Sequence, residues 1–167
     1  YALAETIGGD TFTQSLIWLI NDSTEEVTLS LAGKKLKNEH ITVIHEKLDS
    51  KTITELNLSE NKFDKSIIQV IGSILKKNPT IKKLSLKDNT LTTGGQLINT
   101  WFLETSLIHI DLKSTKLNDQ DINAILRLLS KKTDLVVDLS DNHVESDETL
   151  QPLLRLKGKN RIIYNNN

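Results

Sequence analysis

The chain has 167 residues, of which 37% are hydrophobic and 4% aromatic, and its formal net charge is −1. This length suits one domain, and a net charge so close to zero provides no overall field that would attract DNA, RNA or an anionic membrane. The sequence contains no cysteine, which excludes disulfides and thiolate chemistry, and no apolar run approaches the roughly 20 residues of a membrane-spanning helix.

The first part of the chain, residues 1–25, predicts a helix. Apolar residues recur at helical spacing from Phe12 to Ile20. We expect this helix to be part of a partial repeat or a cap that covers the end of the core. Trp18 lies beside the apolar face, so we expect it to pack in the core or at its end. The chain begins at Tyr1 rather than at methionine, and we therefore expect a segment of a longer protein.

From residue 26 onward, predicted strands alternate with predicted helices. The strands are expected at Glu55–Leu58, Lys83–Leu86, His109–Leu112, Val136–Leu139 and Arg161–Tyr164, after a first strand and turn over Val27–Leu36. Helices are expected over Asn38–Leu48, Asp64–Lys77, Leu97–Phe102 (with Thr92 and Thr93 as caps) and Asp119–Ser130, followed by a short helix with Pro152 in its first turn. Gly72 is expected to let its helix approach the sheet closely. Residues 165–167 read as a frayed end.

One eleven-residue pattern organises the chain. Ile53–Phe63 reads I-T-E-L-N-L-S-E-N-K-F, and the same register returns at Ile81–Leu91 and Leu107–Leu117. The residues at its fourth place recur every 25 to 28 residues: Leu29, Leu56, Leu84, Ile110, Val137 and Ile162. Asparagine at the ninth place is expected to satisfy backbone groups of neighbouring units; it occurs as Asn61, Asn89 and Asn142, with Lys34 and Thr115 as departures. Before Val136 the register is one residue short.

The pattern L-x-x-L-x-L-x-x-N-x-L resembles a leucine-rich repeat, and its period with a full helix per unit resembles the ribonuclease-inhibitor-like class. The resemblance covers about Glu26–Tyr164, which is about five and a half repeats. It implies an α/β solenoid, a right-handed β-α superhelix or horseshoe, with about six parallel strands on the concave face and helices on the convex face. We expect residues 1–167 to form one such domain. The composition also resembles leucine-rich-repeat effectors of intracellular bacteria such as Legionella.

Residues at the third, fifth and seventh places are expected to face outward from the concave sheet. Neighbouring charges on this face either neutralise one another in solvent or form a charge-complementary surface for a protein. Ile108, Ile163 and Val136 would be its apolar anchors. The predicted partner-binding residues are Glu55, Lys83, Lys87, His109, Asp111, Lys113, Val136 and Asp138.

The resemblance implies an interaction scaffold that binds another protein and inhibits or occludes an enzyme partner. An alternative is a substrate-recognition or targeting domain from a larger enzyme or effector. We expect no catalytic activity, cofactor, metal, nucleic acid, membrane insertion or small-molecule substrate, because no catalytic or phosphate-binding motif occurs. A hydrolase or metal site built on Asp111 and Asp138 is the least favoured alternative. We expect a cytoplasmic location, or secretion into a host cell for a bacterial effector.

Overall fold

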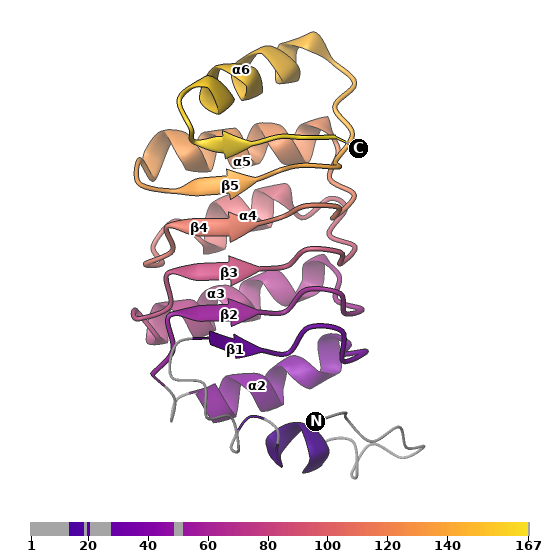
Figure 1. The fold of residues 1–167 in the computed structure, drawn as a ribbon, viewed down its shortest axis with the longest axis vertical. Helices are drawn as coiled ribbons and strands as arrows, with labels where there is room; N and C mark the ends of the chain where they lie inside the picture. The colour runs from indigo at the N-terminus through magenta and orange to yellow at the C-terminus, as the bar shows by residue number, and fades with distance from the viewer. Residues whose placement is uncertain (1–13, 19, 21–27, 49–51, 167) are drawn as a thin grey trace.

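The strands form one parallel sheet in chain order. The structure is a computed structural model that describes residues 14–18, 20, 28–48 and 52–166. Within them, six strands pair in the order β1 to β6, each with its neighbour in sequence (Figure 1). This confirms the predicted α/β solenoid. The strands are β1 (Thr28–Ser30), β2 (Glu55–Asn57), β3 (Lys83–Ser85), β4 (His109–Asp111), β5 (Val136–Asp138) and β6 (Ile162–Ile163).

The helices form a second layer behind the sheet (Figure 1). Packed helices need about 8–10 Å between axes, whereas neighbouring strands need about 4.8 Å. This difference curves the stack, so the sheet takes the inner face. None of the described helices is long and apolar enough to span a bilayer. The helices are η1 (Asn38–His40), α2 (Ile41–Leu48), η2 (Lys65–Ile67), α3 (Ile68–Lys77), α4 (Gly95–Trp101), α5 (Asp119–Lys131) and α6 (Asp147–Gly158).

The fourth-place residues form a continuous buried column between the two layers. Leu29 pairs with Leu56, and the same register continues through Val137 to Ile162. Each of these side chains is at most 2% exposed, and each contributes roughly 1.5–3 kcal/mol on burial. Before β5 the first place is taken by exposed Asp134, and buried Leu135 fills the core from the next place. The shortened register is therefore absorbed before the strand begins.

The ninth-place asparagines join neighbouring coils, a coil being one strand with its turn and helix. Asn61 donates from Nδ2 to the carbonyl oxygens of Leu31 (2.9 Å) and Leu58 (3.0 Å), and its Oδ1 accepts the N–H of Leu36 (3.0 Å). Asn89 and Asn142 make equivalent bonds. The expected satisfaction of backbone groups is thus confirmed.

The eighth place, directly before the ninth-place residue, has positive φ in the first five coils. A left-handed conformation disfavours side chains with a Cβ, so these turns store local strain wherever the residue is not glycine. Among these five coils, only the first uses glycine here. The five residues are Gly33 (φ 64), Glu60 (φ 57), Asp88 (φ 59), Ser114 (φ 55) and Asp141 (φ 55).

The start of α4 corrects the sequence prediction that Thr92 and Thr93 cap this helix. No side chain of its own coil caps α4. Instead the carboxylate of Asp121, from the next coil, accepts the N–H groups of Thr93 (3.0 Å) and Gly95 (2.9 Å). A Cβ on Gly95 would overlap the backbone of Asp121, so the glycine permits this close approach of α4 to α5.

Several other local predictions are wrong. Pro152 lies inside α6, which is a full helix of 12 residues rather than a short one. Gly72 brings α3 close to α4 rather than to the sheet, because a Cβ there would lie 2.8 Å from the backbone oxygen of Trp101. Trp18 is 46% exposed rather than packed in the core. The apolar stripes of the helices are also less deeply buried than their spacing predicts at three positions, since Val70, Leu97 and Leu126 are half-buried.

The N-terminal helix is described only in part. Residues 14–18 and 20 are helical, and Leu16 and Ile20 are buried as expected. Phe12 and the first turn lie outside the described residues. A single domain spanning residues 1–167 therefore stays a prediction.

Candidate functional site

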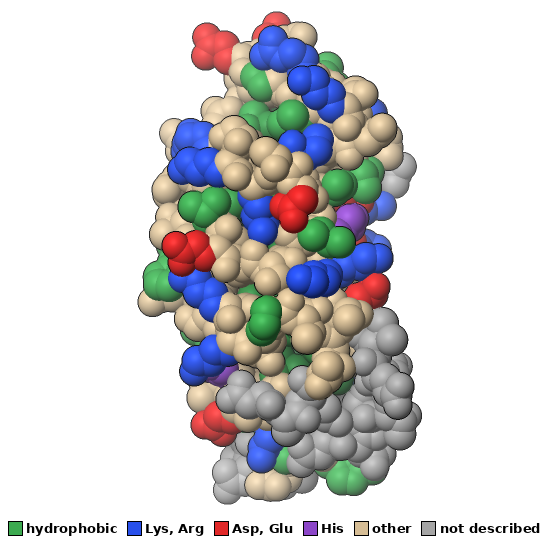
Figure 2. All heavy atoms as spheres, turned by 90° about the vertical axis from the view of Figure 1, so that its left-hand side faces the viewer, with side chains coloured by type: hydrophobic (Ala, Val, Ile, Leu, Met, Phe, Trp, Pro, Cys, Tyr) green, Lys and Arg blue, Asp and Glu red, His purple; other side chains and the backbone are tan. Residues whose placement is uncertain are grey.

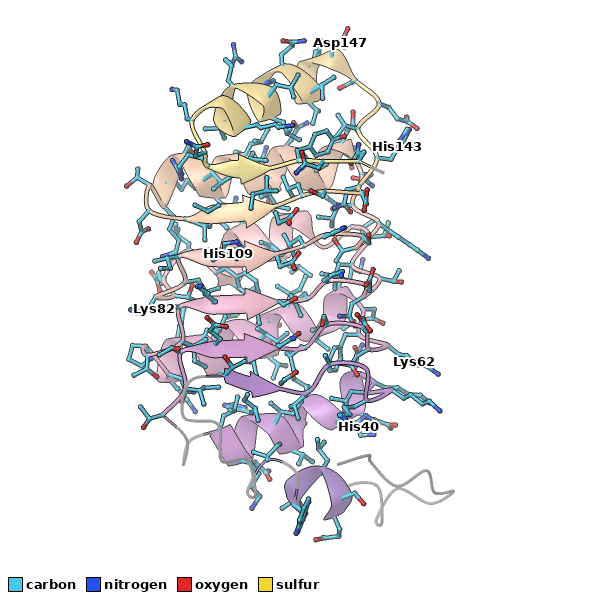
Figure 3. The ribbon with its side chains drawn as sticks, viewed as in Figure 1. His40, Lys62, Lys82, His109, His143 and Asp147 are labelled. Carbon is cyan, nitrogen blue, oxygen red and sulfur yellow. The ribbon has the colours of Figure 1, made fainter. Side chains whose placement is uncertain are left out.

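The sheet carries six of the eight predicted binding residues on one face, and the other two, Lys87 and Lys113, lie in the turns directly after β3 and β4. Glu55, Lys83, His109 and Val136 follow one another in ladder register at the third place. None of the eight is buried, and Glu55, Lys83, His109 and Asp111 line a shallow hollow of about 220 Å³. Figure 3 shows labelled His109 on β4, in the middle of this face. The six strand residues therefore share one face, and the binding of a partner by any of the eight stays a prediction.

Three lysines on this face each lie beside a carboxylate. Lys83 Nζ lies 3.4 Å from Glu55 Oε1, and Lys113 Nζ lies 3.6 Å from Asp141 Oδ2. Lys87 Nζ lies 3.9 Å from a carboxylate oxygen of the next residue in the chain. These groups are all partly exposed, so each pair contributes at most about 1 kcal/mol. The face therefore alternates in charge rather than forming a uniform basic centre.

The two fifth-place aspartates hold turns. Asp111 Oδ1 accepts the N–H of Lys113 (3.0 Å), and Asp138 Oδ1 accepts the N–H of Ser140 (2.9 Å). Among the described residues, neither aspartate forms a salt bridge with Lys87, Lys113 or His109; Lys87 and Lys113 pair with other carboxylates. Metal binding needs several donor side chains together, and the part of the chain that the structure describes contains no cluster of three or more that could hold an ion.

Some outward-facing predictions fail for identifiable reasons. Ser59 and Ser140, at the seventh place, are buried, at 6% and 3% exposure. The Arg161 guanidinium leaves the concave face and donates to the carbonyl oxygens of Leu129 (2.9 Å) and Leu135 (2.8 Å). It thereby satisfies carbonyls at the end of α5, where a cation is favoured.

Apolar side chains are exposed near the sheet's C-terminal half. Ile108 is 40% and Ile163 37% exposed, and Val136 is half-buried between their coils. The backbone N–H of Val136 donates to the Ile108 carbonyl (2.9 Å), so these two side chains come from adjoining coils. The three predicted anchors are therefore available on one side of the face.

A larger hollow of about 650 Å³ lies at the rim where the strands end, between the turns of the fourth and fifth coils. Its walls include Lys116, His143 and Asp119; His143 is labelled at this edge in Figure 3. The Asp119 carboxylate accepts the N–H groups of Glu145 (2.8 Å) and Ser146 (2.7 Å), and these bonds lower its pKa. This hollow was not predictable from the repeat pattern, because it forms between turns about one period apart.

Two further titratable groups lie at the same rim, near the N-terminal end of the stack. Burial lowers the pKa of His40, whose Nδ1 accepts the N–H of Lys37 (2.9 Å). The side-chain hydrogen bond from Asn38 (2.6 Å) lowers the pKa of Asp64. Both groups brace the turns that lead into helices.

Comparison with known proteins identifies the fold. No family model matches the chain, and no curated protein matches it. A solved structure described as leiomodin-1 actin-binding site 2 is similar, with a TM-score of 0.70, 22% sequence identity, and coverage of 94% of this chain and 91% of that one. Together with the repeat and the parallel sheet, this likeness shows a leucine-rich-repeat fold. The ribonuclease-inhibitor-like class and the effector resemblance stay predictions.

Proposed function

We propose that the chain is a non-enzymatic protein-binding module that holds a partner protein against the concave face of its sheet. The observation that carries this proposal is the ladder register of the third-place and fifth-place side chains across β2 to β5. A solenoid sheet of this kind presents many side chains on one rigid surface. The proposed contacts are the eight residues predicted from the sequence.

The polar part of this face is preorganised. Thr28 Oγ1 donates to Glu55 Oε2 (3.2 Å), and the other oxygen of Glu55 lies beside Lys83. Asp111 and Asp138 are fixed by their turns. Binding therefore orders few additional side chains, which lowers its entropic cost, and the alternating charges favour one docking register.

The apolar part of the face supplies anchors. Aliphatic groups that lose water on binding contribute most when they lie beside polar groups that exclude solvent. Val136 pairs with His109 and Ile108 directly precedes that histidine, whereas Ile163 pairs with Asp138 on the next strand pair. We infer that the partner covers the C-terminal half of the sheet more tightly than the N-terminal half.

The similar solved structure supports protein binding as the general role. It is an actin-binding site, which is a property of leiomodin-1. Actin is therefore the first candidate partner to test. The ribonuclease-inhibitor-like resemblance favours one form of this activity, in which the chain acts as an effector-type regulator that occludes an enzyme.

A second candidate role is recognition or targeting within a larger protein. The similar solved structure is one numbered binding site of leiomodin-1, which supports the use of this fold as one part of a protein. In both roles the same concave face makes the contact, with residues 1–167 acting as one solenoid domain.

The test compares two triple charge reversals in a binding assay with purified actin and with proteins captured by the wild-type chain. The concave variant combines Lys83→Glu, Lys87→Glu and Lys113→Glu. The control changes three lysines at the strand-end rim by the same charge: Lys62→Glu, Lys65→Glu and Lys116→Glu. We expect the concave variant to bind a partner about tenfold more weakly and the control to bind within about twofold of wild type. Equal binding by the wild type and the concave variant refutes the proposal.

A further inference from the structure

The loops that lead from α3, α4, α5 and α6 to the strands that follow them form a surface that we call the basic rim, which comprises residues 76–82, 102–108, 131–135 and 157–161. Figure 2 views this side face on and shows Lys and Arg side chains over most of its height. These segments contain eight Lys or Arg residues and two carboxylates, so their formal charge is +6. The surface is distinct from the concave face, although both meet at β4.

Helix ends explain part of this charge. The C-terminus of a helix carries about −0.5 elementary charge, so the four helices α3 to α6 bring about −2 to the rim. The sum of +6 from the side chains and about −2 from the helix ends is about +4. The rim therefore carries more positive charge than is needed to balance the negative C-termini of its helices.

Four of the eight cations support the fold. Lys132 Nζ donates to the Thr105 carbonyl (2.7 Å), and Lys157 Nζ donates to the Tyr164 carbonyl (2.7 Å). Lys76 Nζ lies 3.1 Å from Glu104 Oε2. The fourth is Arg161, whose guanidinium holds three carbonyl oxygens. These contacts fix the loops in place.

The other four cations, Lys77, Lys82, Lys131 and Lys159, project into solvent. None of them forms an ion pair within the described parts of the chain. Ile108, 40% exposed, occupies the same place in its coil as Lys82 in the preceding one, since its N–H donates to the Lys82 carbonyl (2.8 Å). Ile108 thus lies on the rim loop between the loop that carries Lys77 and Lys82 and the loop that begins at Lys131, and Lys159 lies on the loop after that.

We propose that the basic rim docks an extended acidic segment of a partner protein, with one aliphatic residue of that segment seated on Ile108. Alternate side chains of an extended chain lie about 6.8 Å apart. Neighbouring coils are about 4.8 Å apart at the strands and about 8–10 Å at the helices, which brackets that spacing. Lys82 lies at the end of the rim loop before the one that carries Ile108, and Lys131 lies at the start of the rim loop after it, so carboxylates on either side of the aliphatic residue would meet these two lysines.

The rim's chemistry favours an acidic protein segment over nucleic acid or membrane. Single-stranded nucleic acid is held by stacking on aromatic rings. Among the described rim segments the one aromatic residue is Phe102, which is fully buried. A flat anionic bilayer would contact the projecting lysines. It would not explain why an exposed apolar side chain, that of Ile108, lies where the rim turns into the concave face. Ile108 lies where the two surfaces meet, but Lys82 and Lys131 belong to the rim alone, so this proposal and the concave-face proposal can fail separately.

The test uses a fluorescein-labelled peptide of glutamates with one central leucine, and the same peptide with glutamine in place of glutamate. We expect the full chain to bind only the glutamate peptide, with affinity that falls as salt rises. The double variant Lys82→Glu/Lys131→Glu should bind it about tenfold more weakly. The matched control Lys62→Glu/Lys116→Glu, at the strand-end rim, should stay within about twofold of wild type. Ile108→Ser should weaken binding about fivefold and leave the salt dependence unchanged.

Several outcomes overturn this inference. Equal binding of the glutamate and glutamine peptides would show that charge does not drive the interaction. Equal losses of affinity in the two double variants would show that the interaction does not depend on the basic rim. Binding to phosphatidylserine-containing vesicles or to single-stranded RNA through Lys82 and Lys131, with the peptide unbound, assigns the rim to a different partner. Failure of the concave variant to lose partner binding bears on the proposed function alone, since that variant keeps all rim lysines.

Discussion

Replacing Asn89 by alanine tests the ladder that joins the coils. Asn89 is 2% exposed; its Nδ2 donates to the carbonyl oxygens of Leu58 and Leu86, both at 3.0 Å, and its Oδ1 accepts the N–H of Phe63 (3.1 Å). Three bonds of near-ideal length at about 1 kcal/mol each give an expected loss of about 3 kcal/mol. The loss is not recovered easily, because the freed backbone groups are buried and solvent does not replace the amide.

The next coil provides an internal comparison. Thr115 holds the same place there, donating from Oγ1 to the Leu112 carbonyl (2.7 Å), and its own carbonyl accepts the N–H of Leu91 (2.9 Å). A hydroxyl can thus replace one of the amide's bonds. We expect Asn89→Thr to cost about 1–2 kcal/mol, clearly less than Asn89→Ala.

Urea unfolding followed by circular dichroism measures both variants, with the m-value checked for constancy. The exposed neighbour Thr90 supplies the control, and Thr90→Ala should stay within about 0.5 kcal/mol of wild type. The reasoning is refuted if Asn89→Ala unfolds at the same urea concentration as wild type. It is also refuted if the threonine variant loses as much stability as the alanine variant.

Other perturbations test the turns and helix contacts. Gly95→Ala should cost about 3 kcal/mol or more in urea unfolding because the new Cβ overlaps the Asp121 backbone, whereas Gly158→Ala, with open space around it, should be neutral or stabilising. Glu60→Gly should raise the unfolding free energy by about 0.5–1 kcal/mol because φ is 57° there; an unchanged or lower value contradicts the strain argument. The folded-state pKa of His40 is below its ordinary value of 6.5, so the unfolded chain binds the proton first and stability should fall as pH drops below 6.5. In thermal melts, the melting temperature of His40→Gln should depend less on pH than that of wild type between neutral and mildly acidic pH. An identical pH profile would show that His40 does not cause the dependence.

The repeat pattern predicted the parts of the fold that depend on burial within each coil. The fourth-place column and the asparagine ladder follow from spacing alone, since each coil repeats the same inward positions. The six predicted binding residues that lie on strands share one face for the same reason. Side-chain contacts between coils that do not recur from unit to unit were not predictable, as with Asp121 at the start of α4 and Arg161 at the end of α5.

Other misses come from competition between local preference and packing. Pro152 favours the first turn of a helix, but α6 continues through it and buries Leu153. Ser59 is outward by its place, yet it turns back because its N–H and hydroxyl both donate to Asn57 Oδ1, at 3.0 and 2.7 Å. A pattern of apolar residues contains no information about such polar pairings.

The Asp121 carboxylate belongs to one coil and holds the backbone of the coil before it. This joint is particular to one pair of coils, because η2, α5 and α6 begin with a capping side chain of their own coil, at Asp64, Asn118 and Ser146. Thr149 occupies the position in α6 that Asp121 occupies in α5, and it has no carboxylate. Deleting the coil that carries Asp121 would therefore leave the start of α4 without its acceptor, so the third and fourth coils are exchangeable only as a pair.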